Sequence, residues 1–508
     1  MPVISTPSGD IEGLEYKKGL AFRGIRFAQA PVGDLRFHPP QPVVPWEGIY
    51  DATDFGDSAP QPEMPGAEDS LQLPAEPTDE DCLFLNVYTP AADGKRRPVL
   101  FWIHGGGYIM GSGRAYDGSV FVQEHDVVVV TINYRMGALG FMHLGHLDPA
   151  LATSVNTGIL DQICALEWTR DNISAFGGDP DNVLIFGESA GGTSTAMLLG
   201  CPSAEGLFHK AVVHSPHVDL ITVEQGAAAF TNRCIKRLGG DPDVNGMETL
   251  RAATVEELNA LVLPDFDDPA SFQGPALSVR TASNVTFSPA IDGILIPGPV
   301  VETIRSRGAD NVPIIGGGCR HEGTLFPQAL GFKPGGGEFS EDEARSMFAD
   351  AGVDPAQAFA AYEKFAPGSS GHEKLVYALT DTMFRNSMVR ILDGLAESGA
   401  RCWSWMCTWE TDMGRLRATH AMDLMFLWDW AKDDLPAGMR AFAGTDAPLD
   451  LGRAMRAYWV RFAQSGVPSA DGEPVWPQYG TADRPVLLLD AERRIANDFD
   501  GDVRQVWF

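Results

Sequence analysis

The sequence predicts an α/β protein in which one large, mostly parallel sheet carries helices on both faces. Continuous apolar runs at residues 98–103, 126–133, 183–186 and 210–214 are typical of strands that are buried on both sides. The segment 156–172 lies between two of these runs and has apolar residues at helical spacing. Strands that alternate with helices in this way indicate a parallel sheet. We expect one domain over residues 1–508, with helical insertions at about 217–300 and 325–400.

The composition argues against several classes of protein. Apolar residues make up 44% of the chain and charged residues 21%, as in a soluble globular protein, and no apolar run approaches the ~18 residues that span a bilayer. The net charge of −30 would repel nucleic acid and anionic membranes, so neither is an expected partner. The first residues resemble no secretory signal, and the seven cysteines form no C-x-x-C or metal-like pattern. We therefore expect a cytoplasmic protein with reduced thiols and no metal.

The first ninety residues contain strand signals and one acidic stretch. Gly and Pro interrupt the short strands of residues 1–60, which favours an antiparallel flap at the N-terminus. Residues 57–81 contain eight carboxylates and no Lys or Arg, which predicts an exposed loop. The alternating segment 80–90 then predicts a strand.

The buried run 98–103 leads directly into His104-Gly105-Gly106-Gly107. Three glycines at the end of a strand expose backbone N–H groups, although such a run is more often a plain turn than an anion site. His104 stands before the glycines, and we expect it to have a structural role within this loop.

The segment 176–192, FGGDPDNVLIFGESAGG, contains a candidate nucleophile, Ser189. A short strand, Gly187-Glu188-Ser189-Ala190-Gly191 and a helix from Thr193 to Leu199 follow one another. A serine on such a sharp turn has a strained backbone that exposes its hydroxyl, and the helix directs its free N–H groups at a developing negative charge. Because the chain contains this serine turn, an anion site becomes the better interpretation of the glycines at 105–107.

Later segments continue the alternating series. We expect strands at 210–214, which ends before Ser215, and at 312–316, 401–409 and 486–489, with a helix that contains Trp459 and Phe462.

Five blocks of the chain resemble the type-B carboxylesterases, a family that includes bacterial p-nitrobenzyl esterases, cholinesterases and the non-catalytic neuroligins. The resemblance is strong to about residue 215 and looser beyond it, and it implies the α/β-hydrolase fold with helical insertions around the active site. The blocks, in the order of the family, are FRGIRFAQAPVGDLRF, EDCLFLNVYTP, WIHGGGYIMGSG, ALEWTRDNISAFGGDPDNVLIFGESAGG and GLFHKAVVHS.

The resemblance also implies a set of site residues, since α/β-hydrolases carry nucleophile, acid and base in that chain order. Glu322 lies in RHEG, which is similar to the family's D-E-G, and His420 lies in THAMD, which is similar to F-H-A/G-x-E. Asp292 and Asp310 are the reserve acids. The resemblance assigns the oxyanion donors to Gly106, Gly107 and Ala190 and support of the acid to Ser215; spacing and order favour His420 over His209, His214, His217, His321 and His372.

The expected function is hydrolysis of neutral, short to medium acyl esters by a monomeric serine carboxylesterase that needs no cofactor. Amide or carbamate hydrolysis, or transfer to an alcohol, would use the same site, whereas a neuroligin-like binding protein is disfavoured because Ser189, Glu322 and His420 are all present.

Three further expectations come from comparison with the family. In secreted relatives the cysteine at the position of Cys82 pairs with one near Ala59, so Cys82 should be a free thiol. Residues 60–81 contain no aromatic residue that could hold a choline group. The apolar residues near His420 are either pocket walls or core; these are Met422, Met425, Phe426 and Trp428.

Overall fold

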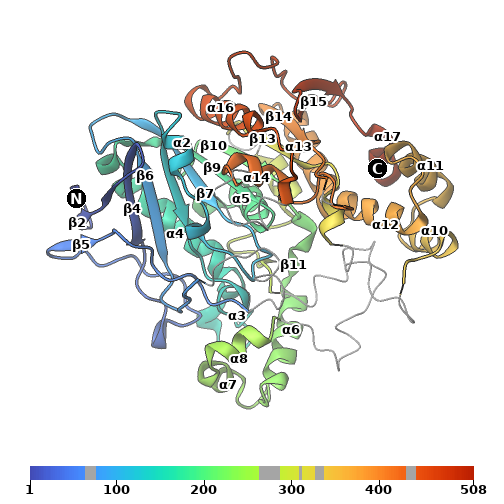
Figure 1. The fold of residues 1–508 in the computed structure, drawn as a ribbon. Helices are drawn as coiled ribbons and strands as arrows, with labels where there is room; N and C mark the ends of the chain where they lie inside the picture. The colour runs from blue at the N-terminus through green and yellow to red at the C-terminus, as the bar shows by residue number, and fades with distance from the viewer. Residues whose placement is uncertain (63–75, 263–286, 308–311, 327–336, 413, 431–441) are drawn as a thin grey trace.

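The fold is organised around a mixed sheet of eleven strands in the described part of the chain. The computed structural model describes residues 1–508 apart from 63–75, 263–286, 308–311, 327–336, 413 and 431–441 (Figure 1). In spatial order the strands are β16 (Arg494–Asn497), β15 (Pro485–Leu489), β14 (Cys402–Cys407), β13 (Ile314–Cys319), β10 (Lys210–His214), β9 (Gly178–Glu188), β7 (Arg97–Ile103), β8 (Val128–Ile132), β6 (Phe84–Thr89), β4 (Gly19–Arg26) and β3 (Leu14–Tyr16).

The centre of the sheet is parallel and its two margins are antiparallel. Every neighbouring pair from β15 through β14, β13, β10, β9 and β7 to β8 is parallel. The pairs β15/β16, β6/β8, β4/β6 and β3/β4 are antiparallel. Parallel strands end at the same edge, so the loops that follow β9, β10, β13 and β14 lie together there.

Both faces of the sheet are buried, as the continuous apolar runs predict. In β7, Phe101 and Ile103 contribute to one core cluster, while Leu100 and Trp102 contribute to the other. The first cluster includes residues of α4 (Thr157–Asn172), α5 (Ala190–Gly200), α9 (Val300–Arg307) and α13 (Asn386–Glu397). The second includes residues of α2 (Ser119–Val122), α14 (Met422–Leu427) and α16 (Leu449–Ser465). The predicted α/β-hydrolase architecture is confirmed.

The N-terminal region differs from the expected antiparallel flap. β1 (Val3–Thr6), β2 (Gly9–Glu12) and β5 (Ile49–Asp51) form a separate three-stranded sheet in which β2 and β5 are parallel. The next two strands, β3 and β4, extend the large sheet instead. Antiparallel pairing accounts for only part of this region, because the chain between β2 and β5, which includes β3 and β4, is long enough for a parallel connection.

The prediction of an exposed loop at 57–81 is wrong for residues 58–60, which are buried, and correct for 77–79, which are exposed; residues 63–75 lie outside the described part of the chain. Glu80 forms an ion pair with Arg36, and Glu76 accepts hydrogen bonds from the hydroxyls of Ser58 at 2.8 Å and Ser112 at 2.6 Å. Fixed partners therefore anchor several of the carboxylates, although the charge pattern alone indicates only a solvated surface.

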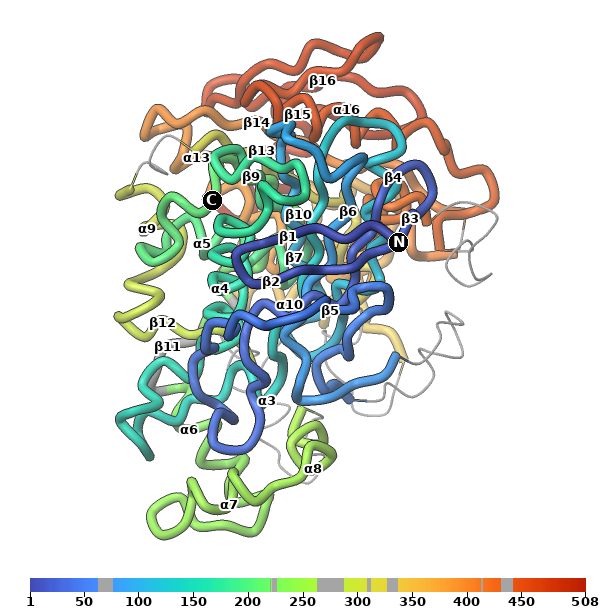
Figure 2. The backbone as a smooth tube through the Cα atoms, turned by 90° about the vertical axis from the view of Figure 1, so that its left-hand side faces the viewer, coloured from blue at the N-terminus to red at the C-terminus, as the bar shows by residue number. Residues whose placement is uncertain are grey.

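The described parts of both insertions contain helices. The first contains α6 (Glu224–Arg237), α7 (Gly246–Ala252) and α8 (Val255–Ala260), which project from the sheet in Figures 1 and 2, and the short β11 (Thr222–Val223) and β12 (Ala290–Ile291). The second contains α10 (Glu341–Asp350), α11 (Pro355–Phe365), α12 (Gly371–Thr380) and a π-helical turn at Asp381–Arg385 that leads into α13. The last helix, α17 (Gly501–Trp507), packs against α11, as Figure 1 shows. No helix among the described residues is both long and apolar enough to cross a membrane.

The apolar residues that follow His420 pack in the core, which favours the core interpretation over that of pocket walls. Met422, Met425, Phe426 and Trp428 are all less than 7% exposed and lie in the second core cluster. The Trp428 ring contacts the rings of Trp102 and Phe121 at 5.1 and 5.4 Å. Their apolar character reflects packing on the sheet.

Candidate active site

Ser189 lies on the turn between β9 and α5. Its φ and ψ are +59° and −119°, a strained conformation for a residue with a side chain. A Cβ on Gly187 would lie 2.5 Å from the Gly191 oxygen, and one on Gly191 would lie 2.0 Å from the Ile103 oxygen. Glycines are therefore required for strand and helix to approach so closely. The Ser189 N–H donates to the His214 carbonyl at 3.1 Å, which fixes the turn to β10.

The glycine loop after β7 lies against this turn. A Cβ on Gly105 would lie 2.7 Å from the Glu188 carbonyl oxygen and 3.1 Å from Ser189 Cβ. Gly106 and Gly107 have φ of +103° and +63°, and a Cβ on Gly106 would lie 2.0 Å from the Met110 oxygen. The loop thus has a backbone that only glycine adopts easily, next to the first residue of α5, Ala190.

His104 has the structural role that its position suggests. Its ring is stacked on Tyr134 with centroids 4.3 Å apart, and its Nδ1 is 2.8 Å from the Gly105 oxygen. The Tyr134 hydroxyl donates to the His104 carbonyl at 2.9 Å. Burial lowers the His104 pKa to about 4, so the ring is neutral at physiological pH.

The candidate acid, Glu322, follows β13 and is 2% exposed. Its Oε1 accepts from the Ser215 hydroxyl at 3.0 Å and from the Cys319 N–H at 2.8 Å. Its Oε2 is 2.7 Å from His420 Nδ1. Two donors on one oxygen leave the other oriented toward the imidazole, as the predicted role of Ser215 requires.

The candidate base, His420, lies in the loop between β14 and α14 and is 4% exposed. Phe384, from the π-helical turn, stacks on its ring with centroids 4.4 Å apart, and Phe326 lies 5.2 Å away. The two aromatic rings restrict rotation of the imidazole and give the surroundings an apolar character.

A second carboxylate, Glu188, lies at the other ring nitrogen. Its Oε1 is 3.0 Å from His420 Nε2, at angles that make the contact an electrostatic one rather than a hydrogen bond. Burial raises the pKa of Glu188 well above that of an ordinary carboxyl group. Burial lowers the His420 pKa, but the charges of Glu188 and Glu322 outweigh it, and the net shift of the pKa is upward. Glu188 was absent from the predicted site, although its position next to Ser189 was a signal.

Of the two reserve acids, Asp292 has other partners than His420. Asp292 accepts hydrogen bonds from Asn156 Nδ2 at 2.8 Å and from the backbone N–H groups of 294–296, which makes it part of a turn. Asp310 lies outside the described residues. Among the residues that the structure describes, no group of His, Cys, Asp and Glu has the arrangement of a metal site.

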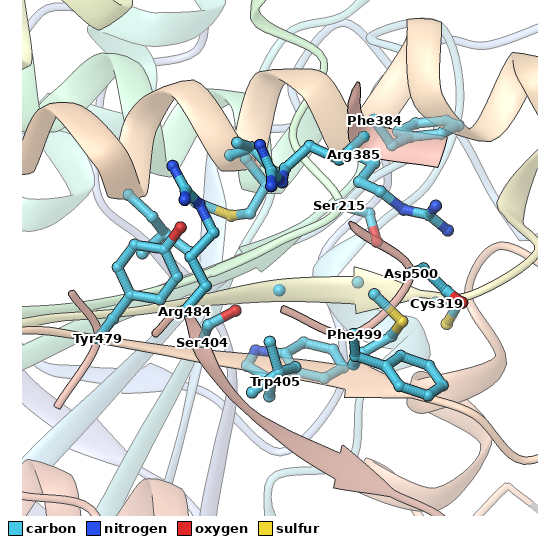
Figure 3. Close-up of a pocket in the computed structure, with 18 of the residues that line it drawn as sticks. Ser215, Cys319, Phe384, Arg385, Ser404, Trp405, Tyr479, Arg484, Phe499 and Asp500 are labelled. Atoms are coloured by element: carbon cyan, nitrogen blue, oxygen red, sulfur yellow. The ribbon is translucent and has the colours of Figure 1, made fainter. Parts of the chain in front are cut away.

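A cavity of about 70 Å³ lies behind the acid, between β13, β14 and α13. Figure 3 shows Ser215 and Phe384 at one end and Tyr479 and Arg484 at the other. Glu322 and Phe384 line the cavity and also contact His420, so they separate it from the imidazole.

The strand order and the position of the serine turn make this molecule an α/β-hydrolase. Residues 1–507 match the profile of the carboxylesterase family. The para-nitrobenzyl esterase of Bacillus subtilis is 34% identical over 515 residues, which cover 100% of this chain and 98% of the relative. The phenmedipham hydrolase of Pseudarthrobacter oxydans is also 34% identical, over 98% of this chain and 97% of its own. A carboxylesterase structure from Geobacillus stearothermophilus superposes with a TM-score of 0.83 at 34% identity, with 100% of both chains covered. The chain belongs to the carboxylesterase family and is a carboxylic ester hydrolase.

Proposed function

We propose that this esterase hydrolyses neutral, short to medium acyl esters through an acyl-enzyme on Ser189. His420 is the base, and Glu322 is the carboxylate of the triad that orients it. The observation that carries the proposal is the 2.7 Å contact between Glu322 Oε2 and His420 Nδ1 at the edge of the sheet that carries Ser189. A carboxylate at Nδ1 holds the tautomer in which Nε2 is free to accept a proton.

In the first half-reaction, Ser189 Oγ attacks the ester carbonyl carbon as its proton passes to His420 Nε2. The carbonyl electron pair moves to the oxygen, and the backbone N–H groups of Gly106, Gly107 and Ala190 stabilise the resulting oxyanion. The tetrahedral intermediate collapses, the bond to the alkoxy oxygen breaks, and the alcohol leaves with the proton from His420. Water then repeats these steps on the acyl-enzyme and releases the carboxylic acid.

The preference for neutral esters is supported by the residues around the imidazole. Phe384 and Phe326 supply aromatic surface beside His420. The sequence 60–81 contains no aromatic residue that could hold a quaternary ammonium group. Three para-nitrobenzyl esterase structures are among the neighbours of this chain, at TM-scores of 0.80 to 0.83, which supports uncharged esters as the substrate class.

The test is a panel of p-nitrophenyl esters of increasing acyl length, assayed with the wild type and Ser189→Ala. We expect kcat/KM to be highest for short to medium chains and almost no turnover by the variant, since loss of a triad serine costs far more than about 10²-fold. Butyrylcholine and its uncharged isostere, 3,3-dimethylbutyl butyrate, should be compared at low and at about 0.5 M salt. A choline preference that persists in high salt would contradict the substrate class.

We also propose that residues 1–508 act as one catalytic domain, that the protein is a monomer and that it is cytoplasmic. Seven unpaired thiols fit a reducing compartment. A sedimentation velocity profile with one species of 54.8 kDa is the expected result; a dimer would contradict it.

A further inference from the structure

A second histidine–carboxylate pair is formed by residues that are close to Ser215 and His420 in the sequence. His214 Nδ1 is 2.6 Å from Asp423 Oδ2, and both side chains are fully buried. His214 is the last residue of β10, and Asp423 is in the first turn of α14, three residues after His420. The mechanism proposed above does not use either side chain.

The tautomer of His214 is determined by Trp459, in α16. The Trp459 indole N–H is 3.1 Å from His214 Nε2, and an indole nitrogen can only donate. His214 Nε2 must therefore accept, so the proton of the neutral ring is on Nδ1 and is donated to Asp423. The direction of both hydrogen bonds is thereby fixed.

Asp423 also contacts the strand that carries the acid. The Cys319 thiol, at the end of β13, donates to Asp423 Oδ1 at 3.4 Å. The side chains of His214 and Cys319 both bond to Asp423, and their backbones contact the candidate triad. The His214 carbonyl accepts from the Ser189 N–H. The Cys319 N–H donates to Glu322. One buried carboxylate thus connects the nucleophile turn, the acid and the segment that carries the base.

The segment that carries the base requires such support. Ala421, between His420 and α14, has a φ of +62°, and Arg417 has a φ of +56°, a left-handed conformation that costs free energy for residues with a Cβ. Strained backbone persists only where surrounding contacts hold it. Asp423, two residues after Ala421, bonds this segment to β10 through His214 and to β13 through Cys319.

We propose that Asp423, held by the Nδ1–H of His214, is the positioning residue for His420. Its carboxylate fixes the first turn of α14, and with it the distance between the imidazole and the nucleophile turn. Displacement of a catalytic group by about 1 Å can cost about 10²-fold in rate, so loss of this bond should appear in kcat.

Two substitutions at His214 separate this role from simple core packing. In His214→Asn, the amide nitrogen superposes on Nδ1 and can still donate to Asp423, while Trp459 loses its acceptor. In His214→Gln, the amide oxygen superposes on Nε2 and can still accept from Trp459, while Asp423 loses its donor. One buried polar atom loses its partner in each variant, Trp459 Nε1 in His214→Asn and Asp423 Oδ2 in His214→Gln, so both should lower Tm.

The expected result is that His214→Gln lowers kcat for a p-nitrophenyl ester by about tenfold or more with little change in KM, whereas His214→Asn stays within about threefold of the wild type. Titration of active sites with an organophosphate corrects both values for unfolded protein. Cys319→Ala and Cys319→Ser form a second pair of variants with a smaller change in side-chain size. Serine keeps a donor to Asp423, whereas alanine does not. Asp93→Asn, which weakens the ion pair of Arg97 at the opposite end of β7, is the control for a loss of stability alone.

Equal kcat values for His214→Asn and His214→Gln, or a lower value for His214→Asn, would overturn the inference. Because the inference rests on the proposed triad, Ser189→Ala is assayed in parallel. Activity in Ser189→Ala would contradict the triad itself, whereas equal His214 variants with an inactive Ser189→Ala would contradict only the positioning role.

Discussion

His420 has a carboxylate at each of its ring nitrogens, and the two have different surroundings. Glu322 is fixed by two donors and accepts from Nδ1, as a triad acid does. Glu188 approaches Nε2, the atom that must receive the serine proton, without the geometry of a hydrogen bond. The first therefore orients the base, and the second acts mainly through its charge.

Replacing Glu322 tests the assignment of the acid. Glu322→Gln keeps the shape but removes the charge that stabilises the imidazolium, and kcat should fall by ~10²-fold or more. Asp292→Asn and Asp310→Asn, in the same ester assay, are the matched controls. A nearly silent Glu322→Gln together with a severe loss in either control would show that the acid is misassigned.

Replacing Glu188 should change the pH dependence. The base must be neutral, so kcat/KM rises with pH through the pKa of His420, which the charges of Glu188, Glu322 and Asp423 raise. Glu188→Gln removes one of these charges and lowers the His420 pKa, so the acidic limb should move to lower pH.

The control is Asp171→Asn, which makes the same change of charge at the exposed end of α4 and should leave the limb in place. An acidic limb of Glu188→Gln that coincides with that of the wild type, or lies at higher pH, would contradict the role of this charge.

At the scale of secondary structure, the site is assembled from the carboxyl ends of four neighbouring parallel strands. β9 leads to Ser189, β10 to Ser215, β13 to Glu322 and β14 to the loop of His420. The positions of these residues depend on the backbone conformation directly after each strand, where the chain leaves the sheet. Left-handed conformations at Ser189 and Ser215, with φ of +59° and +48°, show where those exits are strained.

Strand β10 contributes through Ser215. Ser215→Ala removes one of the two donors to Glu322 Oε1 and leaves the Cys319 N–H in place. A hydrogen bond to a charged group contributes about 1.5–3 kcal/mol, and the remaining donor should limit the loss in kcat to about tenfold. Ser404→Ala, in β14 beside the same cavity, is the control and should have no comparable effect on kcat. A Ser215→Ala enzyme with wild-type kcat would exclude a role for this hydroxyl.

Much of the fold could be predicted because local patterns determine the strands. The run 210–214 coincides with β10, and 98–103 differs from β7 by one residue. Ser189 could be predicted from its own turn, and Glu322 and His420 from chain order and family resemblance, although 98 residues separate them. β16 and α17 were missed because their short sequences carry no strong periodicity.

Features that depend on distant packing could not be predicted. The His214–Asp423 pair joins residues 209 apart, and no local pattern distinguishes this histidine from others in the core. Phe384 contacts His420 because a π-helical turn shifts its direction, which helical spacing does not reveal. The residues of α14 were ambiguous because an apolar pattern near a catalytic histidine fits a pocket wall and a core equally well.

At the scale of the whole molecule, stability does not depend on cross-links. All seven cysteines are buried and unpaired, and burial raises the pKa of the Cys82 thiol. The expected free thiol at Cys82 is thus present, with Ala59 buried at the position where secreted relatives have its partner. A core on each face of the sheet supplies the stability that disulfides provide in smaller proteins.

Alkylation under denaturing, non-reducing conditions tests this directly. Intact mass should show seven adducts, the same number as after reduction. Two fewer adducts without reduction, with Cys82 among the protected residues, would contradict a reduced protein.

In the proposed mechanism the whole fold presents one reactive serine, Ser189, with its base and acid. Titration with a serine-directed organophosphate, followed by intact mass and peptide mapping, tests this most directly. We predict one adduct per chain, located in the peptide that contains Ser189, and a loss of esterase activity in proportion to labelling. An adduct on another residue, or full activity after complete labelling of Ser189, would show that Ser189 is not the nucleophile.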